Sequence, residues 1–265
     1  MGSTDAATAG TTPRNLSYVM FAGVVVIYLL IIQGGGLLLG RISGEDNFLT
    51  PRAVFFGMII PLAVALAFTY VVAAYLGWLR PVLRDDRPTQ TWVRVVPIVF
   101  IIAIALGIDY SALAEKGWVY IVVLLIATQL VGWGEEGMFR GIGVTTLRRH
   151  GLTEGRVALW SSVVFGAVHL SNVVGHGISA LPQAIMVSLA GYFFYLIRRV
   201  SRSNAVNSTI HGLFDFSLLS GTAILVEQKS YVGTLLPILV YPVLAIILFV
   251  KRHDIEPTTT AAQSN

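Results

Sequence analysis

Long apolar stretches recur along this chain, and each is long enough to cross a lipid bilayer as a helix. Mean hydropathy is +0.75, and charged residues make up only 12% of the chain, about half their share in soluble domains. The predicted spans cover residues 17–40, 53–79, 92–110, 118–147, 156–172, 179–197, 204–226 and 231–250. We therefore predict an all-α, polytopic membrane protein with about eight transmembrane helices.

The spans divide into an N-terminal pair and a six-helix remainder. Residues 1–16 and 251–265 are polar and are predicted to be a disordered N-terminal tail and a polar C-terminal tail. Residues 17–91 are predicted to form a transmembrane helix pair and a basic loop. Residues 92–250, in the C-terminal two-thirds, are predicted to form a helix bundle that holds every motif residue described below.

Basic residues predict how the chain is oriented. If the spans alternate, fourteen Lys and Arg residues lie on one side and four on the other. By the positive-inside rule this bias predicts a multi-pass protein of the cell membrane with both termini in the cytoplasm. The same residues lie in short loops beside apolar spans, which indicates membrane orientation and not nucleic-acid binding. With no Cys, a disulfide framework and a thiol nucleophile are excluded.

A few ionisable residues lie inside the apolar runs, where each costs several kcal/mol and by default marks a functional site. They are Glu135, Glu136, Arg140, His169, His211 and Asp215. Measured from the basic end of its own helix, each of Glu135, His169 and Asp215 lies about 20 Å deep. Three helices thus carry polar side chains to one level, near the middle of the membrane.

The spacing of the two glutamates predicts different roles for them. Glu136 and Arg140 are spaced i,i+4, which favours an ion pair. Glu135 projects about 100° away on the helix and is left as a candidate general base. Taken singly, each group also fits a structural role: an interhelical salt bridge, a core histidine beneath Phe165, or a hydrogen-bonded pair of His211 and Asp215. Their common depth favours a functional site.

Three motifs in order on successive membrane helices resemble the CPBP intramembrane proteases, the family of the CAAX prenyl endopeptidases and the bacterial Abi-like proteins. The motifs are Glu135-Glu136-x-x-x-Arg140, Phe165-x-x-x-His169 and His211-x-x-x-Asp215, and the resemblance covers about residues 118–226. It implies an endopeptidase of glutamate type that hydrolyses a membrane-associated peptide or protein within the bilayer. Glu135 and His169 would activate a water, and His211, supported by Asp215, would stabilise the oxyanion. Glu136, Arg140 and Phe165 would support them. Asp215 stands where eukaryotic members have Asn.

Metal use and two other functions stay open at this stage. Two histidines and a carboxylate can bind zinc, but no HExxH or other zinc-binding spacing occurs, so a mechanism without a required cofactor is preferred. Buried acids and histidines are also typical of proton-coupled transporters. A non-catalytic scaffold that binds a partner through the same pocket is the other alternative. The sequence predicts neither the substrate nor the oligomeric state.

Overall fold

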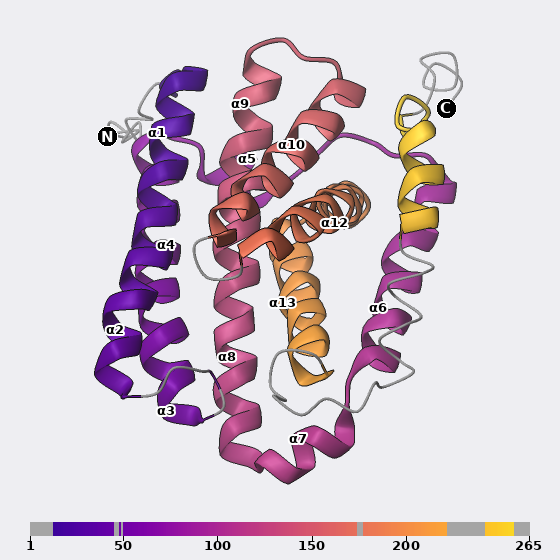
Figure 1. Ribbon diagram of the computed structural model, residues 1–265. Helices are drawn as coiled ribbons and strands as arrows, with labels where there is room; N and C mark the ends of the chain where they lie inside the picture. The colour runs from indigo at the N-terminus through magenta and orange to yellow at the C-terminus, as the bar shows by residue number, and fades with distance from the viewer. Residues whose placement is uncertain (1–12, 45–47, 49, 174–176, 222–241, 257–265) are drawn as a thin grey trace, which may run out of the picture.

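The computed structural model describes residues 13–44, 48, 50–173, 177–221 and 242–256, and every regular element in these residues is helical (Figure 1). The elements are α1 Tyr18–Leu29, η1 Leu30–Gly34, α2 Gly35–Ser43, α3 Pro51–Val54, η2 Phe55–Ile59, α4 Ile60–Tyr75, α5 Leu79–Leu83, η3 Thr91–Arg94, α6 Val95–Gly107, α7 Tyr110–Lys116, α8 Trp118–Glu135, η4 Glu136–Gly143, α9 Val144–Arg149, α10 Glu154–Val168, η5 His169–Asn172, η6 Gly177–Ser179, α12 Ala180–Ser201 and α13 Asn204–Gly221. Residues 242–250 are also helical. The predicted all-α class is confirmed. Most of both predicted tails and residues 231–241 of the last span lie outside the described residues.

In the part of the chain that the structure describes, fewer helices than the eight predicted have the length and apolarity to cross a membrane. Four do so in the described part of the chain, or five if the pair Thr91–Gly107 and Tyr110–Lys116, bent by 54°, is one span. A multi-pass membrane protein is thus supported, but the count of eight is not. Two of the predicted spans show why. Helix α10 has 15 residues and is about 22 Å long, shorter than a core of roughly 30 Å. Helix α13 carries several polar residues.

Glycines allow the helices that carry the motif residues to pack closely. A Cβ atom on Gly132 of α8 would lie 2.4 Å from the carbonyl oxygen of Ser208 and 2.6 Å from the amide nitrogen of Gly212, both on α13. A Cβ on Gly166 of α10 would lie 2.4 Å from the carbonyl oxygen of Ala184 on α12. Backbones this close leave no room for a side chain. The two helix pairs α8–α13 and α10–α12 are therefore held in contact beside the motif residues.

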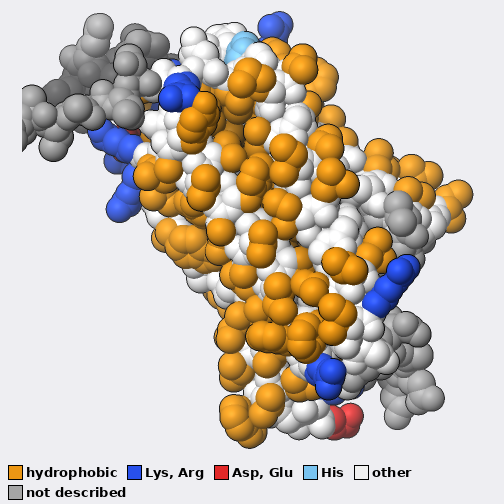
Figure 2. Space-filling view, turned by 90° about the vertical axis from the view of Figure 1, so that its left-hand side faces the viewer, with side chains coloured by type: hydrophobic (Ala, Val, Ile, Leu, Met, Phe, Trp, Pro, Cys, Tyr) orange, Lys and Arg blue, Asp and Glu red, His pale blue; other side chains and the backbone are white. Residues whose placement is uncertain are grey.

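The surface and the chain ends fit a membrane protein. Figure 2 shows hydrophobic side chains over most of one face, with Lys and Arg mainly toward its ends. Both described ends of the chain pack on the segment of residues 76–90. The amide of Arg14 donates to the Leu76 carbonyl at 3.0 Å, and the amide of Gln90 donates to the Ile255 carbonyl at 2.8 Å. The two ends thus lie at the same end of the bundle (Figure 1). Which side of the membrane this is stays a prediction from the basic residues.

The orientation count needs one correction. Arg140 is one of the fourteen basic residues assigned to the cytoplasmic side, but it lies within the span Trp118–Arg149 and pairs with Glu136, so it is not a loop residue. The ratio becomes thirteen to four, and the direction of the bias is unchanged.

A buried ion-pair network closes the end of the bundle near the chain ends. Glu154, the first residue of α10, accepts hydrogen bonds from Nε and Nη2 of Arg148 at 2.7 and 2.9 Å and from Nη1 of Arg199 at 2.6 Å. The Tyr195 hydroxyl donates to the same carboxylate. The network joins α9, α10 and α12. Burial alone would raise the pKa of Glu154, but the hydrogen bonds from Arg148 and the charges of Arg148 and Arg199 outweigh it and lower that pKa from 4.5 to about 2.

Candidate active site

The motif residues from three parts of the chain converge. Glu135 ends α8, His169 follows α10, and His211 and Asp215 lie one turn apart on α13. The Glu135 carboxylate lies 4.0 Å from Nε2 of His169 and 3.7 Å from Nε2 of His211. Nε2 of His211 also lies 3.5 Å from Asp215. The residues that the sequence places at one depth in the membrane therefore also lie close together in the structure.

Glu136 is the buried anchor of this cluster. Its side chain is 0% exposed, and one carboxylate oxygen lies 3.2 Å from Nη1 of Arg140. The i,i+4 ion pair predicted from the sequence is thus present. The same oxygen accepts a hydrogen bond from Nδ1 of His211 at 2.8 Å, and the other accepts one from the amide of Asn207. Two hydrogen bonds and one ion pair thus engage this carboxylate, whereas Glu135 has no hydrogen bond among the described residues.

The two histidines are held in different ways. Nδ1 of His169 lies 2.8 Å from the Phe165 carbonyl oxygen, which can only accept, so Nδ1 carries the proton and Nε2 faces Glu135 as an acceptor. Nδ1 of His211 donates to Glu136, and its Nε2 points between Glu135 and Asp215. The resemblance implied that Asp215 supports His211. In the structure Glu136 fixes one nitrogen of the ring and Asp215 faces the other.

Aromatic rings enclose the charged groups. The Arg140 guanidinium lies over the Phe165 ring, 3.9 Å from its centroid, a cation–π contact that is strongest when it is desolvated. The Phe194 ring stacks on His211 with centroids 4.0 Å apart. Phe194 and Asn207 were not among the predicted residues. Asn207 had a sequence signal, because it lies four residues before His211 and so shares its helix face. Phe194 had none, since it lies in an ordinary apolar run.

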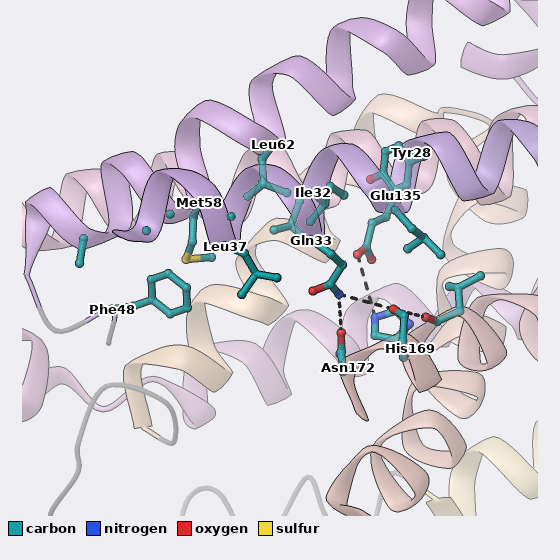
Figure 3. Close-up of a pocket in the computed structure, with 18 of the residues that line it drawn as sticks. Tyr28, Ile32, Gln33, Leu37, Phe48, Met58, Leu62, Glu135, His169 and Asn172 are labelled. Atoms are coloured by element: carbon teal, nitrogen blue, oxygen red, sulfur yellow. Dashed lines mark hydrogen bonds and ion pairs between the residues drawn. The ribbon is translucent and has the colours of Figure 1, made fainter. Parts of the chain in front are cut away.

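A cleft of about 570 Å³ opens onto the cluster. Glu135 and His169 line it in Figure 3, together with apolar side chains that include Leu37, Met58 and Leu62. Most of one wall comes from the N-terminal helices α1 to α4, in which the sequence showed no motif. His211 and Asp215 are not among the lining residues in the described part of the chain. The cleft therefore exposes the candidate base and one histidine.

A metal ion at this site would have to bind the same side chains that form the candidate catalytic cluster. Two imidazole nitrogens and the Glu135 carboxylate are the donor types that zinc prefers. Within the described residues, however, no group of three or more His, Asp or Glu side chains is arranged to hold a metal ion. Metal use therefore stays a matter for experiment.

Comparison with known families agrees with the motifs. Residues 116–217 match the family described as type II CAAX prenyl endopeptidase Rce1-like. All three motifs lie inside the matched residues, so the resemblance predicted from them is confirmed over this part of the chain. The match supports a CAAX-type protease in general. No curated protein and no solved structure matches the chain.

Proposed function

We propose that this chain, whose residues 116–217 match the CAAX prenyl endopeptidase family, hydrolyses a peptide bond of a membrane-associated substrate with Glu135 as general base. The observation that carries this proposal is the contrast between the two glutamates. Glu136 is fully buried, accepts two hydrogen bonds and forms an ion pair with Arg140. Glu135 lines the cleft with two imidazoles within about 4 Å, so its oxygens are free to take a proton from water.

The attacking water would lie between Glu135 and His169. Glu135 accepts one proton of the water, and Nε2 of His169 accepts a hydrogen bond from the other. Because the Phe165 carbonyl fixes Nδ1 as the protonated nitrogen, Nε2 keeps its lone pair for this purpose. The proton held by Glu135 is then available to the leaving amine, as microscopic reversibility of general base catalysis requires.

His211 would stabilise the oxyanion. Its Nδ1 already donates to Glu136, so Nε2 donates as well only when the ring is a cationic imidazolium. The carboxylates of Asp215 and Glu135 lie 3.5 and 3.7 Å from Nε2 and stabilise that positive charge. One such donor contributes roughly 3–4 kcal/mol to transition-state stabilisation. In this role Glu136 orients the ring, and Asp215 balances its charge.

The test uses the purified chain in detergent and a fluorogenic farnesylated peptide that ends in a CAAX sequence. The wild-type chain should cleave it, and Glu135→Gln, which keeps size and hydrogen bonding but cannot accept the proton, should not. Glu115→Gln makes the same substitution at an exposed residue of α7 and should leave cleavage unchanged. Full activity of Glu135→Gln would disprove the proposed role. No cleavage by any variant, with proton-dependent uptake in liposomes, would favour transport; no cleavage and no uptake would favour a scaffold.

We also propose that no metal is required, because the residues themselves supply base, donor and positioning groups. Activity that survives prolonged treatment with a strong chelator would support this. Activity that is lost on chelation and restored by Zn²⁺ would replace the glutamate-activated water with a zinc-bound one.

A further inference from the structure

Helix α1 contributes a polar group to the cleft that no motif describes. Tyr28 lies on α1, outside the residues 116–217 that match the family. Its side chain nevertheless lines the same cleft as Glu135 and His169 (Figure 3). The N-terminal helices therefore pack against the bundle and also form part of the candidate site.

The Tyr28 hydroxyl is buried without a hydrogen-bond partner. The residue is 1% exposed, and its oxygen has no partner in the described part of the chain. A Cβ on Gly134, the residue before Glu135, would lie 2.9 Å from this oxygen. The Tyr28 ring meets Phe139 edge-on, with centroids 6.2 Å apart. Buried polar groups are nearly always hydrogen-bonded, so an exception beside a candidate site points to a ligand.

The chemistry of the surrounding groups indicates what this hydroxyl binds. Near Glu135, the cleft presents acceptors: the carboxylate itself and Nε2 of His169. The amide groups further along are occupied, because Gln33 donates to Asn172 at 2.8 Å and Asn172 donates to Gln183 at 3.1 Å. A peptide in the cleft brings main-chain carbonyl oxygens that need donors. The Tyr28 hydroxyl is a donor at the right place.

We propose that the Tyr28 hydroxyl donates a hydrogen bond to a main-chain carbonyl oxygen of the bound peptide, beside the peptide bond that the water activated by Glu135 attacks. This rests on the proposed function. It makes Tyr28 a substrate-contacting residue that the N-terminal helix supplies to the C-terminal bundle. Since the hydroxyl has no intramolecular bond to lose, removing it affects the substrate and not the fold.

The experiment compares Tyr28→Phe with wild type on the farnesylated CAAX peptide. We expect kcat/KM to fall about tenfold, the effect of one hydrogen bond to an otherwise unpaired partner, and the melting temperature to stay equal or rise. Tyr75→Phe, at a tyrosine that is 64% exposed on α4, should change neither. An unchanged kcat/KM would overturn the proposal. A lower melting temperature alongside lost activity would also overturn it, by showing that the hydroxyl has a structural role.

A second measurement separates this inference from the proposed function. The photoreactive residue p-benzoylphenylalanine replaces Tyr28 in the Glu135→Gln background, where the peptide binds without turnover. We expect a cross-link to the farnesylated peptide at this position and none from the same residue at position 75. If the wild-type chain cleaves and no cross-link forms, the Tyr28 contact is wrong and the protease stands. If the wild-type chain does not cleave but the cross-link forms, the contact stands and the protease proposal fails.

Discussion

Replacing Glu136 by Gln tests the buried anchor of the site, and the structure gives the size of the effect. Three donors converge on this carboxylate: Nη1 of Arg140 at 3.2 Å, Nδ1 of His211 at 2.8 Å and the amide of Asn207. A glutamine side chain offers one acceptor oxygen and an NH₂ group that only donates. The glutamine oxygen can still accept from Arg140 and His211, and the Asn207 amide can turn its Oδ1 toward the new NH₂ group, but the fully buried Arg140 loses the negative charge beside it.

Breaking a buried ion pair from one side costs about 3–5 kcal/mol, well above the roughly 1 kcal/mol of an average substitution. For a chain of this size we expect the melting temperature to fall by about 6–20 °C. Turnover should fall as well, because His211 keeps an acceptor for Nδ1 but loses a negative charge that stabilises its imidazolium form. Thermal unfolding in detergent, followed by tryptophan fluorescence, measures the first effect. The peptide assay at a temperature where the variant is folded measures the second.

A double variant separates charge from packing. Removing both members of a buried pair is often close to neutral, so Glu136→Gln combined with Arg140→Met should be more stable than Glu136→Gln alone. Its turnover should stay low, because His211 still lacks the negative charge of Glu136. The exposed Glu115→Gln again serves as the matched control. A melting temperature of Glu136→Gln equal to wild type, or a double variant no more stable than the single one, would refute this account of the anchor.

The sequence predicted which residues meet, because depth and helical spacing are local properties. Glu136 and Arg140 lie on one helix at i,i+4, so their pairing follows from helix geometry alone. The meeting of Glu135, His169 and His211 follows from their similar distances to basic loop ends, once each run is taken as a helix that crosses the membrane. Both inferences need only the rise and rotation per residue.

What the sequence could not predict depends on how the helices are rotated against one another. The contact between Nδ1 of His211 and Glu136 requires α13 to lie against α8 at one particular register. That register is set by the close approach of Gly132 to Ser208 and Gly212. Tyr28 was missed for the same reason, since nothing in an apolar run shows which of its tyrosines faces a cleft. The count of eight spans is not confirmed, because hydropathy alone does not separate a full crossing from a helix shorter than the membrane core, such as α10.

The remaining predictions concern topology, the oxyanion donor and the buried network at the end of the bundle. Reporter fusions at Asn15 and at the C-terminus should both read cytoplasmic, because basic residues favour that side; an external reading at either position would contradict the topology. His211→Ala should slow turnover by about 10²–10³-fold, and a loss below tenfold would remove His211 from that role. Acid should selectively weaken the network around Glu154, whose pKa is about 2 in the folded chain against an ordinary 4.5. Because the folded pKa is the lower one, this carboxylate stabilises the fold fully above its unfolded value, by about 3 kcal/mol. That stability is lost as pH falls from about 4.5 toward about 2. Glu154→Gln lacks this contribution at every pH, so it should melt well below wild type at neutral pH, and the gap should narrow across the acid range. Melting curves of both proteins over that range measure the gap, and a gap that stays constant as pH falls would show that the ionised carboxylate does not hold α9, α10 and α12 together.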